Sequence, residues 1–178
     1  MARVNGCCVN VGHPAIHDLP YKMASFHVLP SLNADLANTN AVYVNPSDAT
    51  TPYVKMGRFV YKCIPHPDVS RGTVRMNAIA RRAVYPSEEV TLEEYLVPMT
   101  GGPTVVAVQA EFVKSKPGPM PDNLANAVRN MLEGLVVTEG QKLTLTHGDD
   151  AILIHVTGVE SPGVVTMNTE VSLMWLSA

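Results

Sequence analysis

The six-residue stretch Pro98-Met99-Thr100-Gly101-Gly102-Pro103 determines how the chain is organised. Two prolines and two glycines within six positions interrupt the apolar patterns on either side, and such clusters are typical of connections between folded units. We therefore predict a linker at residues 98–102 of this 178-residue chain, between a first unit at residues 25–97 and a second at residues 103–178. Residues 1–24 carry no apolar period and are predicted to form a loose lead-in.

The segments before the linker are short and rich in β-branched and aromatic residues. Strands are predicted at residues 41–44, 58–64, 73–76 and 90–97. Turn residues separate them, such as Asn45-Pro46-Ser47-Asp48. Several short strands at this spacing favour a small β-barrel.

The pattern after the linker changes to strand, helix and strands. Residues 104–114 alternate as a strand, and Asp122 is predicted to cap a helix that ends near Gly134. The residues predicted to share one helical face are Leu124, Val128, Met131, Leu132 and Leu135. Strand segments follow at residues 143–145, 151–156 and 164–176, with a turn at residues 147–150. The second unit is thus expected to be α+β.

Charge is distributed unevenly along the chain. Residues 55–82 hold seven Lys and Arg residues against one acid, Asp68, whereas residues 117–178 hold two basic residues against seven acids. This asymmetry indicates a charged surface for a partner. The alternative, which the sequence leaves open, is that the charges keep sheet edges soluble. The net charge of -3 and the sparse aromatic residues, at 6%, argue against nucleic acid as the partner.

No catalytic or metal-binding constellation is recognisable in the sequence. The chain lacks a Gly-x-x-x-x-Gly-Lys-Ser/Thr phosphate-binding loop and a Gly-x-Ser-x-Gly nucleophile motif. His13 and His17 are four residues apart, but Pro14 and Pro20 disfavour a helix there and no third ligand is evident. We therefore expect no enzyme activity, no metal and no cofactor in this chain.

The cysteine content and the hydropathy pattern predict a cytoplasmic protein without a membrane-inserted segment. The three cysteines, Cys7, Cys8 and Cys63, do not form a disulfide framework. No uninterrupted apolar stretch approaches the length of a membrane span, and no secretory signal is recognisable.

Several collinear segments resemble the N-terminal domain of NSF, the vesicle-fusing family of AAA ATPases. His66-Pro67-Asp68-Val69-Ser70-Arg71-Gly72-Thr73-Val74 is similar to a turn-and-strand segment of that family. Residues 79–83 resemble the basic turn that follows it, and residues 124–143 resemble the family's helix and the strand after it. The resemblance covers about residues 35–178 and rests on the order of these segments.

The resemblance implies a mixed β and α+β fold, in which a double-psi β-barrel at residues 25–97 is followed by an α/β roll at residues 103–178. It implies a non-catalytic domain that binds a SNAP adaptor carrying a SNARE complex, with recruitment to membranes only through the adaptor. In the family, the ATP- and Mg-binding AAA modules are separate from this domain, and the parent protein is a homohexamer.

The resemblance also implies where the partner binds. The basic contact residues of the family map onto Arg81 and Arg82 in the first unit and onto Lys114 and Lys116 in the second, on either side of a groove. A further arginine that the family uses has only His27 as a cationic counterpart, within residues 25–30.

Two other functions compete with this one. An N-domain of the valosin-containing type would keep the fold and bind ubiquitin-related adaptors instead. A small double-psi barrel enzyme such as an aspartate decarboxylase would need a self-processing Gly-Ser dipeptide, and none occurs in the chain.

Overall fold

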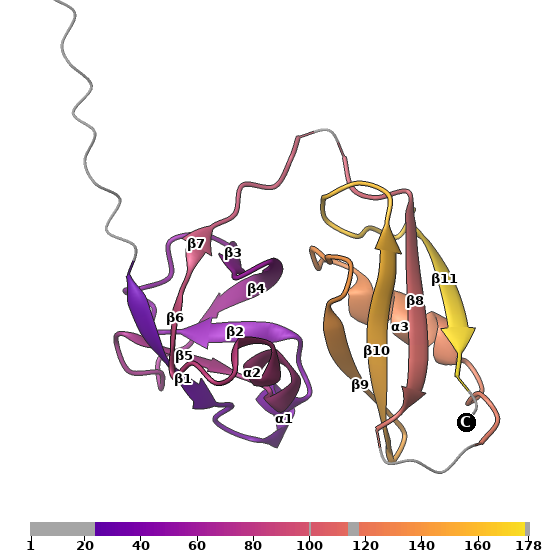
Figure 1. Cartoon of the computed structure of the whole chain (residues 1–178), viewed down its shortest axis with the longest axis horizontal. Helices are drawn as coiled ribbons and strands as arrows, with labels where there is room; N and C mark the ends of the chain where they lie inside the picture. The colour runs from indigo at the N-terminus through magenta and orange to yellow at the C-terminus, as the bar shows by residue number, and fades with distance from the viewer. Residues whose placement is uncertain (1–23, 100, 114–117, 177–178) are drawn as a thin grey trace, which may run out of the picture.

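The computed structural model describes residues 24–99, 101–113 and 118–176. Seven short strands in its first half form one sheet (Figure 1). These are β1 (Ser25–Pro30), β2 (Ala41–Val44), β3 (Tyr53–Met56), β4 (Phe59–Pro65), β5 (Thr73–Met76), β6 (Glu89–Thr91) and β7 (Glu93–Glu94). Their order in the sheet is β6-β1-β5-β2-β4-β3-β7.

One chain segment nearly closes this sheet into a barrel. β6 pairs with β1 at one edge, and β7 pairs with β3 at the other. Only Leu92 separates β6 from β7, so both edges of the sheet belong to the same stretch of chain. The result is a mostly β, barrel-like layer with an apolar interior, as the short strand pattern predicts.

Two helices connect strands of the barrel. α1 (Ala34–Ala37) is a single turn, and α2 (Ala78–Val84) lies between β5 and β6. α2 begins at Asn77, whose side-chain oxygen accepts a hydrogen bond from the backbone N–H of Ala80 at 2.8 Å. The resemblance implies a basic turn at residues 79–83, and this is wrong because the Asn77 cap starts a helix there.

The second half is a four-stranded sheet with one helix packed on one face (Figure 1). Its strands are β8 (Val105–Phe112), β9 (Lys142–His147), β10 (Asp150–Val159) and β11 (Glu170–Trp175), in the order β11-β8-β10-β9. α3 (Leu124–Leu132) buries Leu124, Val128 and Leu132. Their spacing of four residues places them on one helical face against the sheet.

Most of the elements predicted after the linker are confirmed, with two corrections. α3 begins at Asn123, which has a left-handed φ of 58° and makes no side-chain capping bond, so Asp122 is not its cap. The last strand occupies only Glu170–Trp175 within the predicted residues 164–176. The predicted lead-in lies outside the described residues except for Ala24, and Thr100 of the predicted linker is also outside them.

The predictions before the linker need two further corrections. Residues 90–97 form two short strands in place of one long strand, because the chain passes from one edge of the sheet to the other at Leu92. The sequence pattern also missed β1, which pairs with β5 and β6, and β3, which pairs with β4 through a tight turn at Gly57 and Arg58.

The barrel interior contains two ionisable side chains from β4. Tyr61 and Cys63 are both buried among apolar residues. Burial disfavours the charged form of each group, so it raises the pKa of Tyr61 to about 12 and the pKa of Cys63 to about 11. Both groups are therefore neutral in the folded protein at physiological pH.

These shifts predict that alkaline pH destabilises the fold. In the unfolded chain, the Cys63 thiol and the Tyr61 hydroxyl lose their protons near pKa 9 and 10, whereas in the folded chain they keep them to about 11 and 12. The unfolded state then binds fewer protons, so the free energy of unfolding falls as pH rises above about 9. Urea denaturation from pH 7 to 11 measures this fall. Tyr61→Phe should make it shallower above pH 10, and a fall of equal slope in this variant would contradict the assignment.

Candidate binding groove

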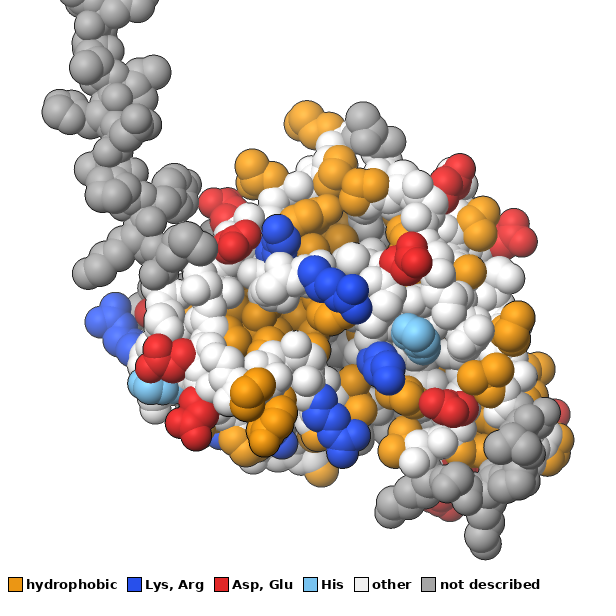
Figure 2. All heavy atoms as spheres, viewed as in Figure 1, with side chains coloured by type: hydrophobic (Ala, Val, Ile, Leu, Met, Phe, Trp, Pro, Cys, Tyr) orange, Lys and Arg blue, Asp and Glu red, His pale blue; other side chains and the backbone are white. Residues whose placement is uncertain are grey.

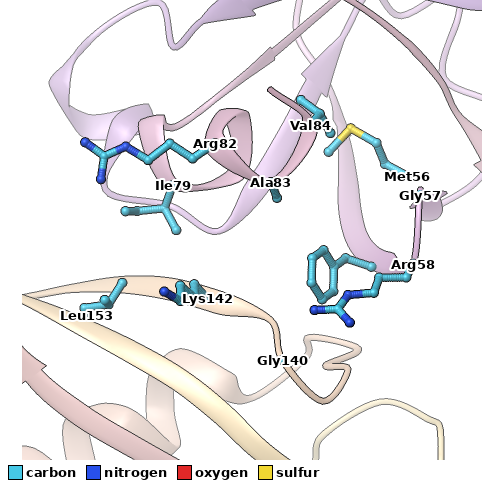
Figure 3. Close-up of a pocket in the computed structure, with 11 residues that line it drawn as sticks. Met56, Gly57, Arg58, Ile79, Arg82, Ala83, Val84, Gly140, Lys142 and Leu153 are labelled. Carbon is cyan, nitrogen blue, oxygen red and sulfur yellow. The ribbon is translucent and has the colours of Figure 1, made fainter. Parts of the chain in front are cut away.

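A groove of about 520 Å³ lies between the barrel and the four-stranded sheet (Figure 3). Both halves contribute to its lining, and three of the lining side chains are cationic. The described residues that line it are Met56, Gly57, Arg58, Phe59, Ile79, Arg82, Ala83, Val84, Gly140, Lys142 and Leu153. The groove therefore combines an apolar wall with three positive charges, and no carboxylate belongs to this lining.

Helix α2 supplies one side of the groove. Ile79, Arg82 and Ala83 lie three and four residues apart, so the 3.6-residue period places them on one face. Ala80, between them in sequence, is buried in the barrel. The side-chain amide of Asn77 also donates to the backbone carbonyl of Thr39 at 2.6 Å. This bond fixes the start of α2 on the barrel and thereby the face that α2 presents to the groove.

Arg58 enters the groove from the turn between β3 and β4. Gly57, with φ 60°, makes this turn, and the Arg58 guanidinium carbon lies 4.8 Å from the centre of the Phe59 ring. A cation held over an aromatic face at this distance is attracted by the ring electrons. Phe59 thus orients Arg58 toward the four-stranded sheet (Figure 3).

Gly140 lies directly opposite Arg58, just before β9. A Cβ atom added to Gly140 would lie 2.8 Å from a terminal guanidinium nitrogen of Arg58, and Gly140 has a left-handed φ of 80°. The backbone conformation favours glycine here, and the Arg58 guanidinium occupies the space beside it. Gly140 therefore makes room for the Arg58 side chain.

At the start of strand β9, buried and exposed side chains alternate, and the exposed one lines the groove. Gln141 and Leu143 are buried, whereas Lys142 between them is exposed and lines the groove. Successive side chains of a strand point to opposite faces. Lys142 is accordingly directed into the groove by the burial of its two neighbours.

Polar side chains form hydrogen bonds between the barrel and the second half of the chain. The Gln141 side-chain amide donates to the backbone carbonyl of Val60 at 3.1 Å, and its oxygen accepts from the backbone N–H of Thr138 at 3.0 Å. The Asn40 side chain forms two bonds with the backbone of Thr144, donating to its carbonyl and accepting from its N–H, each at 2.9 Å. Asn40 thus pairs with Thr144 much as a neighbouring strand would.

A tyrosine makes a third contact between the two halves. The Tyr53 hydroxyl donates to the backbone carbonyl of Gly134 at 2.8 Å. Burial raises the pKa of Tyr53, so the hydroxyl remains a donor at physiological pH. We refer to the contacts of Asn40, Tyr53 and Gln141 as the polar joint.

The structure separates the predicted contact residues. Arg82 lines the groove, whereas Arg81 does not, because adjacent helical residues point in different directions. Arg81 is half-buried, and its Nε atom has no hydrogen-bond partner in the described part of the chain. His27 lies on β1, where its ring is 3.5 Å from Glu89 and outside the groove lining. Lys114 and Lys116 lie outside the described residues.

Sequence reasoning missed Arg58 and Lys142 as groove residues. Arg58 belongs to the basic stretch at residues 55–82, but nothing local distinguishes it until the β3–β4 turn is known. Lys142 had a usable signal, since it stands between the buried residues Gln141 and Leu143 of a strand. Figure 2 shows Lys and Arg side chains gathered along the border between the two halves on this face.

Other kinds of site find no support in the part of the chain that the structure describes. No three His, Cys, Asp or Glu side chains gather there closely enough to hold a metal ion. His13 and His17, weighed above as ligands, lie outside the described residues. Among residues 24–99, 101–113 and 118–176, no helix has both the length and the apolar character needed to cross a bilayer.

Comparison with known proteins does not identify a family for this chain. No protein-family model matches the chain, and no curated protein sequence matches it.

The stability cost of replacing Gly140 can be predicted, and a second glycine with a similar backbone conformation serves as the control. Gly148 also has a left-handed φ, 61°, but a Cβ atom there would meet no atom within 4 Å. Gly148→Ala should cost about 1–2 kcal/mol of stability from backbone strain alone. Gly140→Ala should cost a similar amount, because the atoms that its Cβ meets are the end of the exposed, flexible Arg58 side chain, which can move aside. Urea denaturation of both variants measures the two losses, and a loss for Gly140→Ala well above that for Gly148→Ala would show that the Arg58 side chain cannot move away from Gly140.

Proposed function

We propose that this chain is the non-catalytic, adaptor-binding N-terminal domain of an NSF-like hexameric ATPase. In this proposal it recruits SNAP–SNARE complexes for disassembly during vesicle fusion in the cytoplasm. The observation that carries the proposal is the groove, where Arg58, Arg82 and Lys142 from both halves line one cavity without a carboxylate among the lining residues. Such a surface suits an acidic protein partner.

The finer fold that the resemblance implies is part of this proposal. We propose that the barrel-like sheet is a double-psi β-barrel and that the second half is an α/β roll. The strand pairing supports this. β1 runs parallel to β5, and β2 runs parallel to β4, while β2 and β5 are antiparallel. β1 also pairs antiparallel with β6, just as β4 pairs antiparallel with β3. Strands β1, β2 and β3 therefore have the same kinds of neighbour as β4, β5 and β6, as expected for two interlocked halves.

The chemistry of the groove explains how it would recognise the adaptor. Arginine presents a planar fork that can grip a carboxylate with two hydrogen bonds. The apolar wall of Phe59, Ile79 and Leu153 provides contact area beside the charges. Exposed charge pairs act mainly on association rate and salt sensitivity, so binding by one copy should be weak and should weaken further with salt.

The hexameric parent would compensate for weak single contacts. Linked copies raise the effective concentration of the groove and can increase avidity by roughly 10²–10⁴. ATP and Mg²⁺ would act in the AAA modules of the parent, and this domain would need neither.

Charge reversal in the groove tests the proposal. Replacing Arg82 by Ala should cost only about 0.2–1 kcal/mol of binding free energy, because an exposed ion pair contributes little. The double variant Arg58→Glu/Arg82→Glu adds repulsion and should lose most binding to an immobilised SNAP–SNARE complex. The pull-down is carried out at low and at moderate salt, with circular dichroism to confirm folding.

An arginine outside the groove provides a control for a single charge reversal. Arg71 is exposed and lies outside the groove lining, so Arg71→Glu changes net charge without changing the groove. Equal binding losses in the control and the groove variant, or no loss at low salt, would remove the groove from adaptor binding. A parallel assay with a ubiquitin-related adaptor domain separates the two kinds of N-domain, and preferential binding there would favour the valosin-containing type.

A further inference from the structure

A second cavity, of about 810 Å³, lies where the beginning of β1 meets the β6–β7 segment. Its floor consists of Phe26, Val54 and Cys63, which belong to the apolar interior of the barrel. The other lining residues are Ala24, Asp48, Thr50, Leu92, Glu93, Glu94 and Leu96. We call this cavity the acidic pocket. The apolar interior of the barrel therefore lies directly beneath this cavity.

Among the described residues that line it, the acidic pocket has three carboxylates and no Lys or Arg. Asp48 accepts a hydrogen bond from the backbone N–H of Gly72 at 2.8 Å, and Glu93 lies 3.7 Å from the Lys55 ammonium. Within the described ranges, Glu94 makes no ion pair. The rim thus keeps negative charge that is available to a ligand, whereas the groove is positive.

The rim also exposes a large apolar side chain. Leu96 is 78% exposed although it adjoins the cavity. An exposed aliphatic residue beside an apolar floor extends the area that a ligand could cover, and such patches mark interaction sites. Carboxylates and apolar surface therefore adjoin one another around the same opening.

We propose that the acidic pocket docks a segment of a partner protein that presents an apolar side chain next to a Lys or Arg. The apolar side chain enters the opening and covers Leu92 and the exposed Leu96, which removes apolar surface from water. The neighbouring cation lies at the rim, where Glu93 and Glu94 attract it. This inference does not rest on the function proposed for the groove, because the two sites select ligands of opposite charge.

Two short peptides test the charge and the location together. The probes are acetyl-Gly-Leu-Lys-Leu-Arg-Gly-amide and its counterpart with Glu in place of Lys and Arg, titrated into the ¹⁵N-labelled full chain. The basic peptide should shift the amide signals of Val54, Cys63 and Leu92 in a saturable manner. The acidic peptide should bind this pocket about tenfold more weakly or not at all, because it meets like charges.

A rim variant and a matched control complete the test. Glu94→Gln keeps the shape of the rim and breaks no ion pair among the described residues, and it should weaken the basic peptide about twofold to fivefold. Glu111→Gln, on β8, removes an exposed charge outside the pocket lining and should change nothing.

Four results would overturn the proposal. These are no saturable shift at the pocket amides at millimolar peptide, equal binding of both peptides there, basic-peptide shifts confined to the groove residues, and an affinity unchanged by Glu94→Gln. A fifth is concentration-dependent shifts at Val54 and Leu92 without peptide, which would identify a second copy of the chain as the occupant. Each result concerns the acidic pocket and leaves the test of the groove unaffected.

Discussion

The groove depends on the polar joint, and within the joint on the side-chain amide of Gln141. This amide is buried, and it bonds the backbone of Val60 in the barrel and of Thr138 in its own half. An unsatisfied buried amide costs about 1–3 kcal/mol, so the two halves are favoured only in the arrangement that satisfies it. Asn40 and Tyr53 add bonds of the same kind, each directed at a backbone group of the opposite half. Because hydrogen bonds are directional, these contacts select one orientation, which apolar contact alone would not do.

The positions of the three groove cations follow from this orientation. Lys142, the first residue of β9, lies between the buried residues Gln141 and Leu143, so its side chain is directed outward. Gly140, one residue before Gln141, admits the Arg58 guanidinium. Arg82 is placed by the Asn77 cap, which fixes α2 against the barrel. The residues proposed to bind the partner are thus exposed and adaptable, while their neighbours in sequence are buried and bonded.

The sequence predicts those parts of the structure in which local periodicity and burial agree. The strand pattern of residues 104–114 and the four-residue spacing of Leu124, Val128 and Leu132 both correspond to elements with one buried face. β6 and β7 have only three and two residues, so too few positions show a period, and β3 is defined by its pairing with β4 across the turn at Gly57. α2 was missed because the cap at Asn77 and the burial of Ala80, rather than an apolar stripe, define it.

The candidate site was harder to predict than the fold for a related reason. Arg82 was identified, but its partner Arg58 comes from a turn 24 residues earlier, and Lys142 comes from the other half of the chain. Nothing in a linear pattern brings these three together. Their convergence requires the closure of the barrel at Leu92 and the orientation set by Gln141 and Asn40.

Residual dipolar couplings of the backbone amides test this orientation most directly. They are measured for the wild-type chain and for the Asn40→Ala/Gln141→Ala variant in the same alignment medium. The account predicts that one alignment tensor fits both halves of the wild-type protein in the orientation of Figure 1. It predicts that the variant, with each half still folded, requires a different tensor for each half. A variant that keeps a single shared tensor, or a wild-type protein that needs two, would contradict the conclusion that the polar joint fixes the groove.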